Sequence, residues 1–409
     1  MKTQIFLPLL SLFVLFSCQK EKVNKEPIPI EISEKSKEIL SANNQFGFDL
    51  LKKAFNESSS KNLMISPLSV SQALSMTYNG AANETKTAFE NLLHFNGQTT
   101  SAVNQASLDL TNALLNVDPK INIKIANSIW YKKGFSVEND FILTNQKYYS
   151  AKVQELDFSN PQSKDIINAW VNEKTNKLIP KIIDQILPED VMFLINAIYF
   201  KGSWKAEFDK KQTGQKPFYL SNGSVKNVET MQLKSYFSVY YAENYSVIDL
   251  PYGQGNFSML IVLPTDESSL SDLIKNMDAQ TWSSIVDNLQ IPMSKELKMP
   301  KFKFEYENEL NNELTDLGLG VAFSDFADFT GINKNGGLYV SRVKHKSFIE
   351  VNEEGTEAAA VTSVTVGVTS AGPDSNIFAI DHPFLFAIKE KFTNAILFLG
   401  TVTDPTLTK

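Results

Sequence analysis

The chain has few of the residues on which several common kinds of site depend. Its 409 residues include one cysteine, Cys18, so no intramolecular disulfide can form. Three histidines, His94, His345 and His382, leave little room for a histidine-based metal or acid–base site. Lysine and arginine number 39 against 46 aspartates and glutamates, and the net charge of -7 gives no support to nucleic-acid binding. We therefore expect no metal, no cofactor and no nucleic-acid partner.

The apolar run at the N-terminus is too short to cross a bilayer. It extends from Ile5 to Phe16 after the basic Lys2, which suits the hydrophobic region of a signal peptide. We expect residues 1–17 to be that signal peptide and the Lys/Glu-rich residues 18–30 to be a tether.

Cys18 follows a small residue at the end of this run, an arrangement similar to the lipobox of bacterial lipoproteins. Phe16 is bulkier than the usual residue at its position. We expect lipidation at Cys18 and an exported bacterial lipoprotein, anchored at the periplasmic face or the cell surface. The alternative is a plain secretory signal with an incidental cysteine.

Residues 352–373, NEEGTEAAAVTSVTVGVTSAGP, lack charge, proline and bulk for most of their length. From Ala358 to Gly372 there is no charge and no side chain larger than valine. Such residues favour extended backbone, and proteins normally interrupt an exposed neutral strand with charge or proline. If residues 356–368 form a strand, one face carries Thr356, Ala358, Ala360, Thr362, Val364, Val366 and Val368. Nothing in this segment would prevent its insertion into a sheet, although a permanent strand is the alternative.

The rest of the chain favours an α+β fold. Residues 39–55 and 168–179 have helical patterns. A short strand at 63–65 should precede a helix capped by Ser66, with Pro67 first and Gly80 at its end. Strands are predicted near 121–131, 191–200, 259–263, 298–306, 338–348, 384–388 and 395–400, and the apolar run at 191–200 predicts burial on both faces. Helices dominate early and strands late, unlike repeated βαβ units.

Several segments, in this order, resemble the serpin family. NLMISPLSVSQALSMTYNGA is similar to the helix beneath the main sheet, and NAIYFKGSWKAEFD and LYVSRVKHKSFIEVNEEGTEAAA to two of its strands. DHPFLFAI and ILFLGTVTDP are similar to the last strands. The resemblance covers nearly all of the mature chain. It implies one serpin domain over 31–409, with a large, mostly antiparallel main sheet, smaller sheets, a helical N-terminal half and a mobile reactive-centre loop at about 353–378.

The resemblance implies a monomeric suicide inhibitor of proteases, not an enzyme. A protease cleaves the loop and is held as an acyl-enzyme while the freed strand inserts into the main sheet. The implied hinge of the loop comprises Glu353, Gly355, Thr356, Glu357, Ala358, Ala359 and Ala360. No Gly-x-Ser-x-Gly motif occurs, and neither His345 nor His382 lies in a catalytic motif. The alternative is a non-inhibitory serpin that acts as a binding or adhesive surface lipoprotein.

The resemblance also implies roles for residues that control opening of the sheet. Ser66, Ser69, Asn196 and His345 would form a polar cluster, the shutter, beneath the centre of the main sheet, and Trp204 would lie at its top, the breach. Lys301 and Glu353 would form an exposed pair that contributes about 0–1 kcal/mol to the hinge. Alternatively, Ser66 merely caps a helix and His345 is an ordinary buried polar residue.

The loop sequence predicts the kind of protease that it attracts. Counting forward from Gly355 at the family's spacing places the scissile bond at Thr369-Ser370, with Val368-Thr369 as the alternative, whereas counting back from Pro383 places it after Gly372. No lysine or arginine lies between Gly355 and Ile388. The small residues around the bond suit the pocket of an elastase-like serine protease, and papain-like cysteine proteases are a second class of partner.

Overall fold

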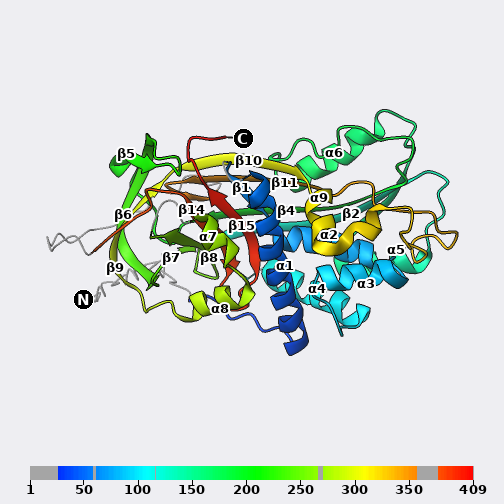
Figure 1. Cartoon of the computed structure of the whole chain (residues 1–409), viewed down its shortest axis with the longest axis horizontal. Coiled ribbons are helices and arrows are strands. Elements are labelled where there is room, and N and C mark those ends of the chain that lie inside the picture. Colours follow the sequence, from blue (N-terminus) through cyan, green and yellow to red (C-terminus); the bar gives the residue numbers. More distant parts are fainter. Residues whose placement is uncertain (1–25, 59–60, 116, 266–269, 357–375, 409) are drawn as a thin grey trace, which may run out of the picture.

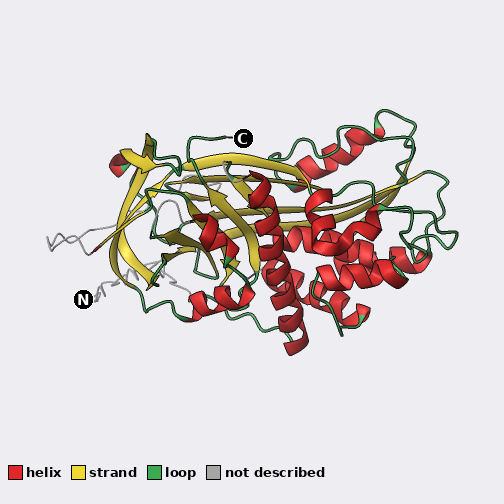
Figure 2. Cartoon of the chain, in the orientation of Figure 1, coloured by secondary structure: helices red, strands yellow, loops and turns green. Residues whose placement is uncertain are grey.

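The computed structural model describes residues 26–58, 61–115, 117–265, 270–356 and 376–408. Most of its helices gather toward one end of the molecule, and its strands form two sheets, from which long strands extend between the helices at that end (Figure 2). No helix in these ranges is long and apolar enough to span a bilayer. The helices are α1 (Glu34–Ser58), α2 (Pro67–Tyr78), α3 (Asn83–Leu92), α4 (Thr100–Leu115), α5 (Asn139–Tyr149), α6 (Ser163–Lys174), α7 (Leu270–Lys275), α8 (Ala279–Asp287) and α9 (Asn311–Leu314).

The larger sheet has nine strands. In spatial order it contains β1 (Leu63–Ile65), β15 (Ile396–Val402), β14 (Phe384–Glu390), β8 (Phe257–Pro264), β7 (Tyr245–Tyr252), β6 (Val225–Tyr241), β9 (Met293–Pro300) and β13 (Ile377–Ala379), with β5 (Gly214–Tyr219) paired to β6. All of its pairs are antiparallel except β13 with β9. Every residue of β8 is buried, and the strand lies where the apolar run at 259–263 predicts one.

The second sheet has six strands and contains the start of the predicted loop. Its spatial order is β10 (Phe302–Glu309), β11 (Lys344–Asn352), β12 (Gly355–Thr356), β4 (Met192–Ser203), β2 (Ile121–Lys132) and β3 (Lys152–Leu156). Helix α2 packs against both β4 and β15, and the apolar side chains of α6 pack on the opposite face of β2 and β4 (Figure 1). The expected α+β serpin-type architecture is therefore present.

The two residues of β12 separate β4 from β11. Thr356 pairs antiparallel with Val351 of β11 and with Gly202 of β4, so β4 and β11 run parallel to each other. At this level the two strands are about twice the ordinary strand spacing apart, ~9.5 Å. Among the described residues, no backbone pairing joins β4 directly to β11. We call the space between them the β4–β11 interval.

Cavities lie along this interval. One of about 200 Å³ is bordered by residues 192–198 of β4 and 344–346 of β11, and one of about 30 Å³ lies nearer to Thr356. They explain why the predicted burial of β4 on both faces is wrong. Ile195, Ala197 and Tyr199 are buried beneath the α6 side, whereas Leu194, Asn196 and Ile198 are only half-buried.

Three other boundaries differ from the sequence prediction. Helix α6 lies at Ser163–Lys174 instead of 168–179, because Asn176 and Lys177 have left-handed backbone angles. The predicted strand at 298–306 is two strands in different sheets, since the chain crosses between the sheets at Lys301. Residues 338–343 precede β11 instead of forming it, because backbone groups of Val340 and Val343 bond to Ala322, Leu310 and Asn311.

The start of α2 is as predicted. Pro67 is its first residue, and the Ser66 hydroxyl accepts a hydrogen bond from the backbone N–H of Ser69. The helix ends at Tyr78, two residues before Gly80. This cap places Ser66 directly beneath the six-stranded sheet, where it meets His345 of β11.

Candidate functional site

Thr356 is held in the sheet by its side chain as well as by its backbone. Its side chain is buried, and its Oγ1 lies 2.6 Å from the hydroxyl of the fully buried Tyr252. The ring of Tyr252 stacks on Trp204, with centroids 4.3 Å apart. The side chain of Thr356 therefore points into the core, which makes the even-numbered face of the hinge the core-facing one.

Gly355 is required where the chain enters the sheet. Its φ of +152° lies outside the range that side chains usually adopt, and a Cβ here would lie 2.1 Å from the carbonyl oxygen of Gly202. The close approach lets Gly355 pair with both β11 and β4. The glycine of the predicted hinge thus has a specific structural role.

Trp204 forms two hydrogen bonds to the turn at residues 352–354, just before Gly355. Its indole Nε1–H donates to the carbonyl of Asn352 at 2.9 Å, and its backbone N–H donates to the carbonyl of Glu354. Phe208 donates its backbone N–H to Glu353. The tryptophan thus connects the end of β4 to the end of β11, the position that the resemblance implies for the breach.

The Lys301–Glu353 pair forms, but the expectation that it is exposed is wrong. The Glu353 side chain is 6% exposed and lies 3.3 Å from the Lys301 Nζ. It also accepts a hydrogen bond of 2.8 Å from the Thr213 hydroxyl, on a segment that covers it. Burial raises the pKa of Glu353, but backbone, Thr213 and Lys301 contacts outweigh it and leave the pKa below its usual value. Loss of Lys301 would therefore leave a buried carboxylate without its cation, which destabilises a fold strongly.

Ser66, Ser69 and His345 form one hydrogen-bonded group. The Ser66 hydroxyl donates to the carbonyl of Leu397 at 2.7 Å, and its backbone N–H donates to His345 Nε2 at 3.3 Å. Ser69 contributes its backbone N–H to the Ser66 hydroxyl. A further member, Ser347, donates to the carbonyl of Met64 at 2.6 Å. The group ties the start of α2 to β11 and β15, and Ser347 was missed by the sequence analysis.

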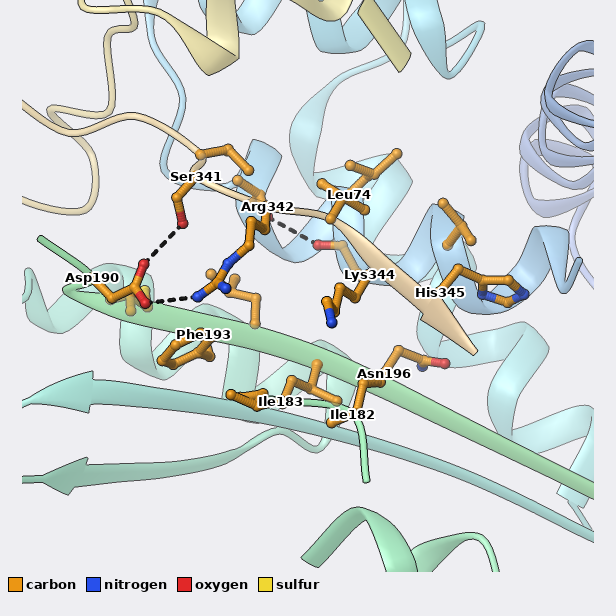
Figure 3. A pocket seen from close by; sticks show the side chains of 18 of the residues that line it. Leu74, Ile182, Ile183, Asp190, Phe193, Asn196, Ser341, Arg342, Lys344 and His345 are labelled. Carbon is orange, nitrogen blue, oxygen red and sulfur yellow. Dashed lines mark hydrogen bonds and ion pairs between the residues drawn. The ribbon is translucent and has the colours of Figure 1, made fainter. Parts of the chain in front are cut away.

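Asn196 belongs to a second group, contrary to the single cluster expected. Its Nδ2 donates to Gln72 Oε1 at 3.0 Å and to Asn127 Oδ1 at 2.7 Å. Its Oδ1 is buried and has no hydrogen-bond partner in the described part of the chain. Gln72 and Asn127 were not predicted, although each is a polar residue within an apolar helix or strand. Ser69, Asn196 and His345 nevertheless line the same 200 Å³ cavity. Figure 3 shows Asn196 and His345 in it.

His345 is held in its neutral form. Burial lowers the pKa of this imidazole to about 4, although the carbonyl of Met64 acts in the opposite direction. Because Nε2 accepts from the Ser66 N–H, Nδ1 carries the proton of the neutral ring. This hydrogen bond would be lost if both ring nitrogens were protonated.

Residues 357–375 lie outside the described residues. They include Glu357, Ala358, Ala359 and Ala360 of the predicted hinge and both candidate bonds around Val368, Thr369 and Ser370. Cys18 also lies outside the described residues. Their roles stay predictions.

The comparisons with known proteins identify the family. The family model described as "Serpin (serine protease inhibitor)" matches residues 41–405, so the chain belongs to the serpin family. A serpin-like protein of Methanosarcina mazei is 35% identical over 90% of this chain and 88% of that protein. The human leukocyte elastase inhibitor is 33% identical over 90% of this chain and 100% of that protein. The crystal structure of the thermophilic serpin tengpin in its native state is similar, with a TM-score of 0.83 and 33% identity over 93% and 97% of the two chains.

The lowered pKa of His345 predicts loss of stability in acid. The ring takes up a proton at pH 6.5 when unfolded but only near pH 4 when folded, so falling pH favours the unfolded chain across this window. Between pH 7.5 and 4.5 the His345 contribution should fall by about 2.5 kcal/mol. We expect His345→Gln to remove that part of the pH dependence of urea unfolding.

An NMR titration of the native protein supplies an independent test. A His345 ring signal that titrates near pH 6.5 would contradict the assignment.

Proposed function

We propose that this protein inhibits proteases as a suicide substrate. A protease would cleave the loop that follows Thr356 and remain attached as an acyl-enzyme. The freed strand would then extend from Thr356 along the β4–β11 interval. The observation that carries the proposal is the position of Gly355 and Thr356, which are already paired on both sides as the first two residues of a central strand.

The pairing register predicts where the later residues would go after cleavage. Continued from Thr356, it would place Ala358 between Phe200 and Ile349, and Thr362 between Asn196 and His345. The inserted residues would cover the half-buried side of β4 and bring a hydroxyl to the unpartnered Asn196 Oδ1. Each new backbone hydrogen bond would contribute roughly 0.5–1.5 kcal/mol. Insertion is therefore favoured by both pairing and burial.

The composition of the hinge favours an inhibitor over a binding module. On the core-facing side Thr356 is followed by Ala358, Ala360 and Thr362, none of which is charged, bulky or proline. A surface lipoprotein that uses the fold only for binding or adhesion would have no need for these residues. It is the second candidate, and it predicts cleavage of the loop without any stable complex.

We propose elastase-like serine proteases as the main targets. The loop offers valine, threonine, serine and alanine around Thr369-Ser370 and no basic residue for a trypsin-like pocket. The name of the 33% identical leukocyte elastase inhibitor supports the same class of enzyme. Papain-like cysteine proteases are a second class, since neighbouring small residues make more than one bond usable.

Arginine on the core-facing side of the hinge should turn the inhibitor into a substrate. In Ala358→Arg the guanidinium would have to be buried between Phe200 and Ile349, which costs several kcal/mol without a partner. We expect the yield of SDS-stable complex with elastase to fall at least about tenfold while the loop is still cleaved. Thr356→Arg should behave in the same way.

The matched control is Glu357→Arg, the adjacent residue on the opposite face. The same register places it beside Lys201 and Glu350, both only half-buried, so its complex yield should stay close to that of the wild type. Equal yields from Ala358→Arg and Glu357→Arg would show that insertion with this register does not occur.

The bond at Thr369-Ser370 can be tested by mass spectrometry of the complex. Denaturing the complex with elastase should release a C-terminal peptide that begins at Ser370, or at Thr369 for the alternative bond. A peptide that begins before Gly367 or after Ala371 would contradict both bonds. Trapping of trypsin but not of elastase would contradict the target class.

We propose that Cys18 carries the lipid that anchors the protein to a membrane. Ile28, near the start of the described residues, is fixed to the fold, because its backbone N–H and C=O both bond to the Asn256 side chain, at 2.9 and 2.6 Å. The proposed tether would end at this point. The anchored chain would thus leave the fold beside the turn between β7 and β8.

Replacement of Cys18 should release the protein. We expect Cys18→Ala to be recovered in the soluble fraction of the exporting cells, because two or more acyl chains are what hold such a protein stably. The same variant should inhibit elastase as well as the wild type does. Wild-type protein that is soluble and carries no acyl group after export would refute the lipid anchor.

A further inference from the structure

The β4–β11 interval has a second end, opposite the hinge. Thr356 is level with Gly202 of β4 and with Val351 of β11. Ten residues back from Gly202 lies Met192, the first residue of β4, and ten residues back from Val351 lies Ser341, three residues before β11 begins. At ~3.3 Å per residue this end lies about 33 Å from Thr356. The beginnings of β4 and β11 thus face one another across the interval.

An ion pair joins the two strand beginnings. Asp190 Oδ2 lies 2.8 Å from the Nη2 of Arg342, and its Oδ1 accepts a hydrogen bond of 3.2 Å from the Ser341 hydroxyl (Figure 3). The backbone N–H of Leu187 also donates to Asp190, at 2.8 Å. The Asp190 side chain is 1% exposed and that of Arg342 is 19% exposed. Arg342 is the one arginine in the sequence.

The ion pair of Asp190 with Arg342 also links the connection between α6 and β4 to the residues at the start of β11. We call residues 175–191 the crossing segment. Ile179, Ile182 and Ile183 pack against the outer face of β4, and Arg342 Nη2 donates to the carbonyl of Gln185 at 3.3 Å. Asp184 forms a second, more exposed ion pair with Lys344, the first residue of β11. The crossing segment therefore spans from β4 to β11 on the side opposite α2.

We propose that the Asp190–Arg342 pair is a clasp that controls how far and how fast a strand advances between β4 and β11. The inference rests on the proposed insertion mechanism and adds a positioning role for two residues far from the loop. A strand that extends ten residues beyond Thr356 reaches the level of the clasp. Further advance requires β4 and β11 to separate there, so the pair must stretch or break.

The physical setting makes the clasp a barrier to the last part of insertion. The pair lies in a poorly solvated site, where salt screens it little, whereas Asp184 and Lys344 are exposed enough to be screened. The residues of an inserting strand that lie nearer to Thr356 than this level do not touch it. The clasp should therefore slow spontaneous uptake of the uncleaved loop while leaving the hinge free to begin insertion.

The test removes both charges together, because either single variant would leave a buried charge without its partner. In Asp190→Leu/Arg342→Met the spontaneous conversion to a urea-resistant, inactive form should accelerate about tenfold, equivalent to ~1.4 kcal/mol of barrier. Urea-gradient gels and residual elastase inhibition would follow the conversion over time. Added salt should leave the wild-type rate unchanged.

The matched control is Lys303→Met/Glu350→Gln, which removes an ion pair of the same 2.8 Å length between β10 and β11, strands that stay paired throughout. Its conversion rate should equal that of the wild type. If the clasp variant also converts at the wild-type rate while cleaved wild type becomes urea-resistant, the clasp is wrong and the insertion mechanism stands. If cleaved wild type never becomes urea-resistant, the proposed function fails, and the clasp fails with it.

Discussion

The separation of β4 from β11 by two residues is the constraint on which the rest of the structure depends. Gly355 and Thr356 occupy the width of one strand, and the described parts of β4 and β11 make no backbone pairs with each other. Unpaired backbone groups beside a cavity are costly in a folded protein. In the proposed mechanism a strand that fills the interval would pair these groups, and a kinetic barrier would preserve the unfilled state until then.

Contacts hold the strands that border this interval at two successive levels. At the top, Tyr252, Trp204 and the buried Glu353 hold the start of the hinge. In the middle, two polar groups tie α2 to the strands on either side. One contains Ser66 and His345, and the other contains Asn196. These polar side chains bond to the strands but do not fill the space between them. A larger apolar side chain at the same positions would fill it.

The sequence predicted the parts of this arrangement that depend on local patterns. The serine–proline start of α2 and the strand β8 follow from capping and from an apolar run in the sequence. The family resemblance added the pairing of Lys301 with Glu353 and the position of Trp204. The resemblance did not predict how exposed each of these side chains is to solvent. Glu353 was expected on the surface, but Thr213, which is 140 positions away in the chain, helps to cover it.

Contacts between residues far apart in the sequence also explain the other predictions that were wrong. Asn196 bonds to Gln72 and Asn127 because α2 crosses beneath β4 at that point, and no local pattern reports where two elements cross. The strand near 298–306 divides because Lys301 lies where the chain passes from one sheet to the other. The half-burial of β4 follows from the interval beside it, which depends on residues more than 150 positions later.

The most direct test of the account is the heat stability of the protein before and after its loop is cleaved. A protease that is not trapped would nick the loop, and calorimetry would compare the two forms. About ten newly paired residues should raise the midpoint of thermal unfolding by on the order of 10 °C or more. An unchanged or lower midpoint in the cleaved protein would show that the interval between β4 and β11 does not accept the strand.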